Sequence, residues 1–314
     1  MTPMRRLIEC VPNFSEGRDA ACIEAIVSAM SGVPEAWVLD RHSDADHNRT
    51  VVTVAGAPEA VIEAALRGVA AAARSIDMNC HRGVHPRIGA TDVLPFVPIE
   101  GVSMEECVEF AHRAGKAIWE RCRVPVYFYE AAALLPERRA LEKVRKGQLE
   151  SLRRDAPLDA QRAPDVGGPV LHPTAGATAV GARKFLIAYN INLATPDAGA
   201  AAEIARAIRA SSGGLPALKA LGIALRSRGI SQVSMNLTDF EQTSLQQAFD
   251  AVKSEAGRRG CAIAGSEIVG LVPRKALENS AECIRALDRF SDDQILENRL
   301  AAVMGPREAA RVSA

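Results

Sequence analysis

Histidine and arginine are concentrated in one short segment, His81-Arg82-Gly83-Val84-His85-Pro86-Arg87. Because imidazole titrates closest to neutral pH, His85 is the first candidate for acid–base catalysis. Pro86 restricts the backbone of His85 to extended conformations and so presents the ring on a stiff segment. Arg87 can bind a carboxylate through two hydrogen bonds. A polar surface turn without chemistry accounts for these residues equally well, because His-Pro-Arg is a short motif.

A second polar segment runs from Asp40 to Arg49 and contains three aspartates and two histidines. Its spacing matches no standard metal motif, so we predict a solvated loop between two strands and no metal site. Asp40 ends one predicted strand and Arg49 begins the next, so both can contact a substrate. Asn13 and Ser15 follow the first predicted strand. They either contact a substrate as well or cap the first helix.

A third candidate is the predicted strand Phe185–Leu193, in which Asn190 and Asn192 share one face with Ala188. The other face is apolar and is predicted to be core. Two neighbouring amides need hydrogen-bond partners if they are buried, and either a ligand or nearby loop backbone can supply them.

Glycine and proline recur between residues 151 and 184, where no periodic pattern is found. The segment has neither a dinucleotide-binding nor a P-loop pattern, and the serine-hydrolase elbow is absent as well. We predict a long loop whose backbone can approach a flat ligand closely, at the boundary between domains of residues 1–184 and 185–314.

The elements that must position these residues alternate between short apolar runs and amphipathic helices. Strands are predicted at 7–11, 37–40, 50–55 and 124–129, and 92–99 is predicted to be an edge strand or loop because Pro95 and Pro98 interrupt it. A capping box at Ser103 and Glu106 begins one helix. A similar set follows residue 184, with a hairpin about Arg228-Gly229. We therefore predict an α/β (α+β sandwich) fold with two βαββαβ subdomains and a ligand cleft between them.

The composition is that of an ordinary soluble globular protein, with 38 basic and 38 acidic residues among 314. This balance argues against nucleic-acid binding. The basic pairs Arg138–Arg139 and Arg145–Lys146 are predicted to lie on solvated helix faces. The seven widely spaced cysteines indicate a reducing compartment, and no segment is apolar enough for a signal or a membrane span. We expect a cytoplasmic protein that binds small molecules and no membrane.

Nine segments in order resemble the glutamate formimidoyltransferase (formiminotransferase) family, and together they are highly specific. They span about Leu7 to Leu277 and are Glu9-Cys-Val-Pro-Asn-Phe-Ser-Glu-Gly17, Asn48-Arg-Thr-Val51, Ile76-Asp-Met78, His85-Pro-Arg-Ile-Gly-Ala-Thr-Asp-Val93, Ala163-Pro-Asp165, Gly176-Ala-Thr178, Gly181-Ala-Arg-Lys-Phe-Leu-Ile-Ala-Tyr-Asn-Ile-Asn-Leu193, Gln232-Val-Ser-Met-Asn236 and Gly265-Ser-Glu-Ile-Val-Gly-Leu-Val-Pro273.

The resemblance implies transfer of a formimidoyl group from N-formimidoyl-L-glutamate to tetrahydrofolate in histidine degradation. It also implies a homodimer of two-subdomain chains with folate bound in the cleft. His85 matches the family's catalytic histidine. The family's folate-binding loop matches Gly167, Gly168, Pro169, Val170, Leu171, His172, Pro173, Thr174, Ala175 and Gly176.

For the glutamate carboxylates the candidates are Arg49, Arg87 and Arg183, and Asn13, Asn190 and Asn192 can orient the amidine.

The chain departs from animal members at three positions. Val84 replaces a glutamate before the catalytic histidine, Ala175 replaces a tryptophan in the folate loop, and His42 replaces an aspartate. With 314 residues, we expect no cyclodeaminase domain like that of the animal enzymes. Two alternatives remain open from the sequence, a formyltransferase that uses N-formylglutamate and a non-catalytic folate-binding scaffold.

Overall fold

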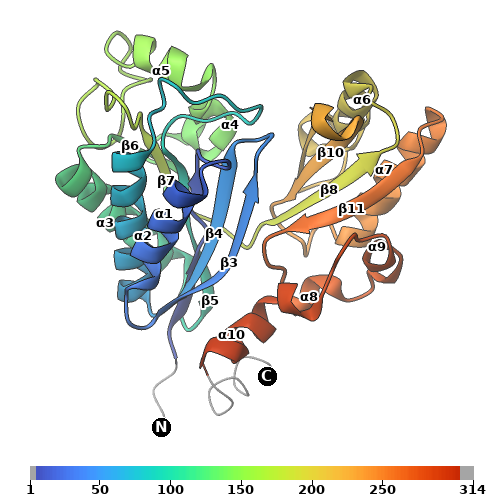
Figure 1. Ribbon diagram of the computed structural model, residues 1–314, viewed down its shortest axis with the longest axis horizontal. Coiled ribbons are helices and arrows are strands. Elements are labelled where there is room, and N and C mark those ends of the chain that lie inside the picture. Colours follow the sequence, from blue (N-terminus) through green and yellow to red (C-terminus); the bar gives the residue numbers. More distant parts are fainter. Residues whose placement is uncertain (1–4, 305–314) are drawn as a thin grey trace. The chain divides into compact units, whose positions relative to one another are not determined.

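The structure is a computed structural model that describes residues 5–304. The chain forms two compact units that divide between Arg183 and Lys184, and each has its own hydrophobic core (Figure 1). Residues 5–183 are called unit 1 and residues 184–304 unit 2. Both units combine a sheet with helices, as the predicted α/β class requires. The ligand cleft expected between the units stays a prediction.

Unit 1 contains a seven-stranded sheet. The order begins with β3 and β4 and ends with β5, β7 and β6. The short strands β1 and β2 share the position between β4 and β5 and pair with both. The strands β5, β7 and β6 run parallel to one another, and the other pairings are antiparallel. Their bounds are β1 Leu7–Cys10, β2 Asn13–Phe14, β3 Ala36–Asp44, β4 Arg49–Gly56, β5 Thr91–Glu100, β6 Val126–Glu130 and β7 Thr178–Ala182.

Three helices cover one face of this sheet, and two shorter helices lie in the connection from β6 to β7 (Figure 1). Local signals fix where the long helices begin. Asp19 caps the first, Pro58 is the first residue of the second, and the predicted capping box of Ser103 and Glu106 begins the third. The bounds are α1 Ala20–Ser31, α2 Pro58–Ser75, α3 Met104–Cys122, α4 Leu141–Val144 and α5 Gln148–Asp155, with a 3₁₀ turn at Pro136–Arg139.

The prediction of an edge strand or loop at residues 92–99 is wrong, because β5 lies inside the sheet. It pairs with β1 and β2 on one side and with β7 on the other. Proline is tolerated at position 95 because the neighbouring line of strands is itself broken at Pro12, between β1 and β2. The predicted edge therefore forms part of the sheet centre.

Two predicted loops are shorter than expected. The strand β3 continues to Asp44, so most of the polar segment after Asp40 belongs to a hairpin with β4. The segment 151–184 includes the end of α5 and the whole of β7. The sequence did not predict β7 because most of its residues are small. Gly181 is needed because an added Cβ would lie 2.6 Å from the ring of Tyr129.

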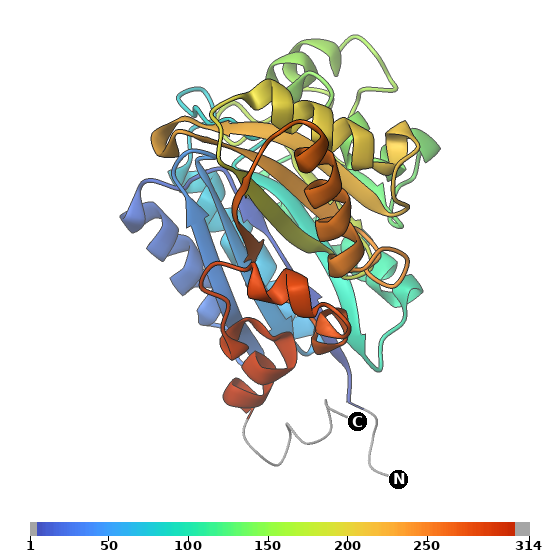
Figure 2. The ribbon, with the colours of Figure 1, turned by 90° about the vertical axis from the view of Figure 1, so that its right-hand side faces the viewer.

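Unit 2 contains a four-stranded antiparallel sheet in the order β11-β8-β10-β9. The helices α6 and α7 pack side by side across one face, as Figure 2 shows. The predicted hairpin is confirmed, with Gly229 in the left-handed region at its turn. The bounds are β8 Ile187–Leu193, α6 Ala198–Ile208, β9 Leu218–Leu225, β10 Ile230–Leu237, α7 Leu245–Arg258, β11 Ile263–Val269, α8 Arg274–Leu277, α9 Ala281–Arg285 and α10 Leu296–Met304, with 3₁₀ turns at Ala210–Ser212, Arg226–Arg228 and Asp292–Gln294.

The predicted alternation along β8 is confirmed. Ile187, Tyr189 and Ile191 are fully buried in the core of unit 2, and Asn190 and Asn192 project from the opposite face. The sheet therefore presents amides on the side that α6 and α7 do not cover.

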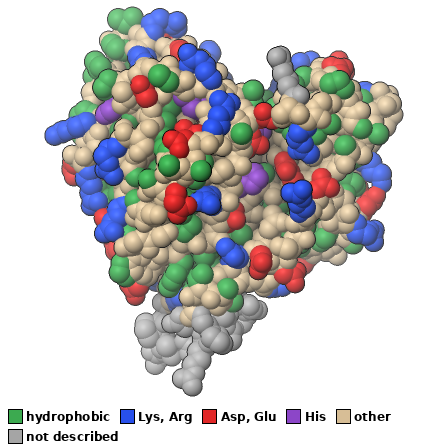
Figure 3. Space-filling model, in the orientation of Figure 1, with side chains coloured by type: hydrophobic (Ala, Val, Ile, Leu, Met, Phe, Trp, Pro, Cys, Tyr) green, Lys and Arg blue, Asp and Glu red, His purple; other side chains and the backbone are tan. Residues whose placement is uncertain are grey.

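Acidic and basic side chains are interspersed over the face drawn in Figure 3. The predicted exposure of the basic pairs is wrong for one residue of each pair. The side chains of Arg138 and Arg145 are 7% and 14% exposed and form ion pairs with Asp165 and Asp92. Within residues 5–304, no helix is both long and apolar enough to span a bilayer.

Candidate active site

The face of the unit 1 sheet that α1–α3 leave uncovered carries a line of polar residues. In the register of β3 and β4, Asp40 lies opposite Thr53, His42 opposite Val51 and Asp44 opposite Arg49. The intervening pair of Ser43 and Thr50 is joined by a hydroxyl contact of 2.9 Å on the helix side. Because strand side chains alternate, the aspartates and His42 share the uncovered face with Arg49.

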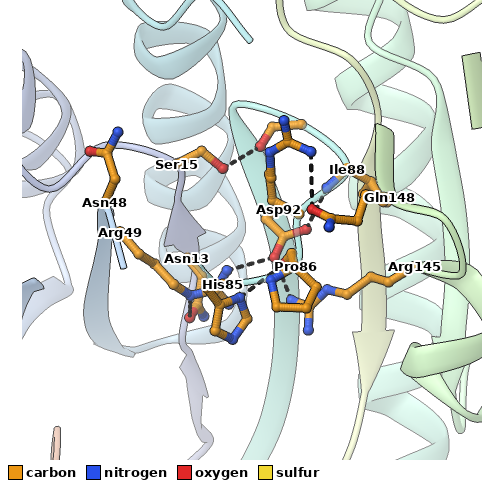
Figure 4. Close-up of polar contacts among 12 residues, drawn as sticks. Asn13, Ser15, Asn48, Arg49, His85, Pro86, Ile88, Asp92, Arg145 and Gln148 are labelled. Atoms are coloured by element: carbon orange, nitrogen blue, oxygen red, sulfur yellow. Dashed lines mark hydrogen bonds and ion pairs between the residues drawn. The ribbon is translucent and has the colours of Figure 1, made fainter. Parts of the chain in front are cut away.

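Asp92 is the centre of an ion-pair cluster on this unit (Figure 4). Its Oδ2 accepts from Arg49 at 2.6 Å and also from Arg145, and its Oδ1 accepts the backbone N–H of Ile88 at 2.9 Å. Arg49 donates in addition to Asn13 at 3.0 Å. One buried carboxylate thus joins β2, β4, β5 and the segment before α5.

Asp92 is ionised in this environment. Burial by itself raises the pKa of its carboxyl, but the charges of Arg145 and Arg49 outweigh burial and lower it to about 2. The side chain is completely buried, so both guanidinium groups are held close to one fixed negative charge. The cluster of Arg49, Arg145 and Asp92 therefore carries one positive charge in excess, and its ion pairs hold it in place.

His85 lies next to this cluster and is half-buried (Figure 4). Its Nδ1 is 2.7 Å from the carbonyl oxygen of Pro86. Because a carbonyl only accepts hydrogen bonds, Nδ1 carries the proton and Nε2 keeps its lone pair. Burial, and then the positive charges of Arg49 and Arg145, hold the pKa of His85 well below its ordinary value. The ring is therefore a neutral base at pH 7.

A second imidazole approaches His85 from the β3–β4 hairpin. The ring centroids of His47 and His85 are 6.2 Å apart. Nδ1 of His47 lies 2.9 Å from Oδ1 of Asp44, which also accepts the backbone N–H of His47 at 2.7 Å. The hydrogen bond from His47 is the main cause that lowers the pKa of Asp44 to about 2. Within the described residues, no three His, Cys, Asp or Glu side chains are placed to hold a metal ion.

Arg87 is oriented away from this cluster by partners of its own. Its guanidinium donates to both carboxylate oxygens of Glu150, at 2.7 and 2.9 Å, and to Gln148 at 3.1 Å. Its Nε donates to Nδ1 of His81 at 3.3 Å. A substrate carboxylate would have to displace Glu150, so the geometry favours a positioning role for Arg87.

Asn48 holds the hairpin turn against the histidine segment. Its side chain accepts from the backbone of Gly17 at 2.9 Å and donates to the carbonyl of Arg82 at 3.1 Å. Its own carbonyl lies 3.0 Å from Nε2 of His81. The approach is close enough that a Cβ at Gly83 would lie 2.3 Å from the carbonyl oxygen of His47. Backbone contact thus brings His47 and His85 together.

The predicted folate loop lies between α5 and β7, and its second half packs on the residues that directly follow the histidine segment. Ala90 donates to the carbonyl of Ala175 at 2.8 Å, and Ala177 donates to that of Ile88 at 3.0 Å. Val170 is 71% exposed, whereas Ala175 is 2% exposed and belongs to the core. Position 175 therefore packs inward here, and a ring-stacking surface does not include it.

The remaining predicted residues lie in two places. Asp40 is half-buried on the uncovered face of unit 1, and Arg183 directly follows β7 and hydrogen-bonds to Tyr129. In unit 2, Asn190 donates to Glu267 at 3.2 Å, and Asn192 accepts from Gln232 at 3.0 Å. The amides of unit 2 thus have protein partners, while Oε1 of Gln232 is buried and has none among the described residues.

The sequence interpretation missed Asp92, Arg145 and His47. Asp92 lies in the segment that resembles the family, and its single carboxylate in an apolar strand was a usable signal. Arg145 gave no signal, because it is 53 residues from its partner. His47 was assigned to a solvated loop, since no local pattern shows that the turn meets residue 83.

Two family models match this chain. The N-terminal subdomain of the formiminotransferase domain matches residues 7–183, and the formiminotransferase domain model matches residues 188–300. The chain belongs to the formiminotransferase family.

Curated relatives of this formiminotransferase chain include a glutamate formimidoyltransferase of Streptococcus pyogenes, 46% identical over 95% of the chain and 99% of the relative. A glutamate formimidoyltransferase of Thermoplasma acidophilum is 43% identical over 94% of the chain and 97% of the relative. The formimidoyltransferase-cyclodeaminase of Mus musculus is 44% identical over 88% of the chain, which matches 52% of that longer protein.

Proposed function

We propose that this chain transfers the formimidoyl group of N-formimidoyl-L-glutamate to tetrahydrofolate, giving 5-formimidoyltetrahydrofolate and glutamate. The observation that carries the proposal is the neutral imidazole of His85, which is fixed beside two arginines in a formiminotransferase. Its Nε2 has no hydrogen-bond partner among residues 5–304. Tetrahydrofolate is the co-substrate. The near full-length similarity to two proteins named glutamate formimidoyltransferase supports this donor rather than N-formylglutamate.

His85 acts as the general base. Nitrogen 5 of tetrahydrofolate attacks the carbon of the protonated amidine, and the electron pair of the carbon–nitrogen double bond moves to the terminal nitrogen. This gives a tetrahedral intermediate with a positively charged N5. Nε2 of His85 accepts the proton from this nitrogen and then gives it to the departing glutamate nitrogen, and such proton transfer typically contributes about 10²–10⁴ in rate. The carbon–nitrogen bond to glutamate breaks with its electron pair on the glutamate nitrogen, and the lone pair of the terminal nitrogen re-forms the double bond to carbon. The low pKa of His85 keeps Nε2 unprotonated before attack. Positioning of the two substrates supplies the remaining acceleration.

The arginines divide into two roles. Arg49 and Arg145 are available for a substrate carboxylate, because they share one carboxylate between two guanidinium groups. Arg183 is a third candidate at the end of β7. Arg87 positions the histidine segment through Glu150, and it binds a substrate carboxylate only where that carboxylate displaces Glu150.

The other predicted contacts enter the proposal as follows. Residues 167–176 bind folate, with the exposed part of the loop around Val170 as the contacting surface. Asn13 and Asp40 contact the donor from unit 1, and Asn190 and Asn192 contact substrate from unit 2. We also propose domains of residues 1–184 and 185–314, a cytoplasmic homodimer, and a place in histidine degradation.

A transfer assay tests the function. Tetrahydrofolate is combined with N-formimidoylglutamate or with N-formylglutamate, and the folate product is followed spectrally. We expect turnover with the formimidoyl donor and little with the formyl donor. The His85→Asn variant is expected to lose at least about a hundredfold in kcat while its tetrahydrofolate Kd stays unchanged. Full activity of His85→Asn, or folate binding by the wild type without turnover of either donor, contradicts the proposal.

A further inference from the structure

Four polar side chains meet on the face of the unit 2 sheet that α6 and α7 leave uncovered. In the strand register, Gln232 lies opposite Asn192 and Glu267 lies opposite Asn190, so all four project from the same face. We call these four residues the amide cluster. Its three amides are almost completely buried, and Glu267 is half-buried. Polar groups buried to this extent need hydrogen-bond partners, which makes each of their atoms informative.

The carboxylate of Glu267 orients two of the amides. Its Oε1 accepts from Nδ2 of Asn190 at 3.2 Å and from Nε2 of Gln232 at 3.1 Å. Nε2 of Gln232 also donates to Oδ1 of Asn192 at 3.0 Å, so both of its hydrogens are used. Because a carboxylate accepts hydrogen bonds, the nitrogen of Gln232 must face Glu267 and its oxygen must point elsewhere. The orientation of this amide is therefore fixed by the protein.

The atoms that remain without a partner in the amide cluster are acceptors. Oε1 of Gln232 is buried and has no hydrogen-bond partner within residues 5–304. Glu267 accepts from two neutral amides but forms no ion pair with any residue of that range. Burial of an acceptor without a donor costs free energy, and so does desolvation of a carboxylate without a cation. The amide cluster therefore lacks N–H donors and one positive charge.

We propose that the amide cluster binds the cationic amidine of the donor substrate, and that Gln232 and Glu267 determine the preference for a formimidoyl over a formyl group. A protonated amidine is planar, carries one positive charge and has N–H donors on both nitrogens. Its charge matches Glu267, and its N–H groups match the unpartnered oxygen of Gln232. This inference deepens the proposed function and rests on it.

The same arrangement disfavours N-formylglutamate. Where the amidine has a terminal NH₂ group, the formyl group has an oxygen, which only accepts hydrogen bonds. That oxygen would meet the acceptor oxygen of Gln232 or the carboxylate of Glu267. It would leave a buried acceptor unpaired and bring no positive charge. The two donors thus differ at the atom that the amide cluster contacts.

The test measures donor binding to the full chain by titration calorimetry in the absence of tetrahydrofolate, so that no transfer takes place. The ligands are N-formimidoyl-L-glutamate and N-formyl-L-glutamate, and the variants are Glu267→Gln and Gln232→Leu. Asn236→Leu is the matched control, because Asn236 is an exposed amide on the same face of β10 and lies outside the amide cluster. We expect unchanged Kd values for both ligands in this control.

Glu267→Gln keeps the size of the side chain and an acceptor for the two amides, but it removes the charge and adds N–H donors. We expect its Kd for the formimidoyl ligand to rise about 10–100-fold, while its Kd for the formyl ligand stays the same or falls. Gln232→Leu is expected to raise the Kd for the formimidoyl ligand as well. A merely structural role weakens the binding of both ligands together, so opposite responses are diagnostic.

An equal loss for both ligands in Glu267→Gln overturns the inference, and so does an unchanged Kd for the formimidoyl ligand. A higher tetrahydrofolate Kd with unchanged donor binding assigns the amide cluster to the pterin ring and also overturns it. Should a variant fail to fold in thermal unfolding, the wild type decides, because equal affinities for the two ligands contradict the inference. Wild type that prefers the formimidoyl ligand but shows no turnover contradicts the proposed function alone.

Discussion

At the scale of single residues, the charge around each imidazole decides its chemistry. His85 faces two guanidinium groups that share the carboxylate of Asp92, so positive charge is in excess beside it. His47 faces the carboxylate of Asp44 instead. The two rings therefore lie in opposite electrostatic surroundings, and the positive surroundings of His85 favour its neutral form, which is the form that can act as a base.

Replacement of Arg145 by glutamine tests the electrostatic cause. The low pKa of His85 keeps the base unprotonated, and activity requires a pH above this pKa. Loss of one neighbouring positive charge raises the pKa, so the acid limb of kcat/KM moves to higher pH. We expect a larger loss of activity at pH 6 than at pH 8, measured by a pH–rate profile. A limb that stays in place or moves to lower pH shows that Arg145 does not set the pKa.

At the scale of elements, backbone contact between the β3–β4 hairpin and the segment before β5 builds the site. Gly83 allows that contact because a Cβ there would overlap the carbonyl of His47. Asn48 adopts a left-handed conformation at the hairpin turn, where its side chain joins residues 17 and 82. Close packing of the two segments thus fixes the position of His85.

The Gly83→Ala variant tests this contact. The added methyl group meets backbone rather than a flexible side chain, so the turn must move and separate His47 from His85. We expect a loss of about 1–3 kcal/mol in the free energy of unfolding and a reduced kcat. Chemical denaturation and the transfer assay measure the two effects. Gly168→Ala is the control for stability, because nothing lies within 4 Å of its added Cβ. Equal stability of both variants contradicts the contact.

At the scale of the whole molecule, two separate cores support the two units. The core of unit 1 runs from Ile8 to Ala182, and that of unit 2 from Ile187 to Cys283. The sheet of each unit is built only from its own strands. We therefore predict that each unit can fold by itself.

A fragment of residues 184–304 tests that independence. We expect it to be folded and to unfold cooperatively, because α6 and α7 cover one face of a complete four-stranded sheet. Circular dichroism and dispersed amide NMR signals measure this outcome. A fragment with unfolded-chain spectra shows that unit 2 needs unit 1.

The sequence by itself determined the type and order of most elements, because hydrophobic periodicity and caps are local signals. The capping box at Ser103, the alternation along β8 and the hairpin at Gly229 all follow from neighbouring residues. The motif around His85 was visible for the same reason. Family membership was also accessible, since it depends on the order of motifs.

Only the tertiary structure decided which polar groups meet. Arg145 pairs with Asp92 across 53 positions, His47 reaches His85 through a turn, and Arg87 binds Glu150 across 63 positions. It also placed β5 inside the sheet despite Pro95, because β1 and β2 break opposite that residue. The physical reason is that charge, burial and strand neighbours are set by long-range packing. No local pattern in the sequence predicts these contacts, although they determine the charges that surround His85.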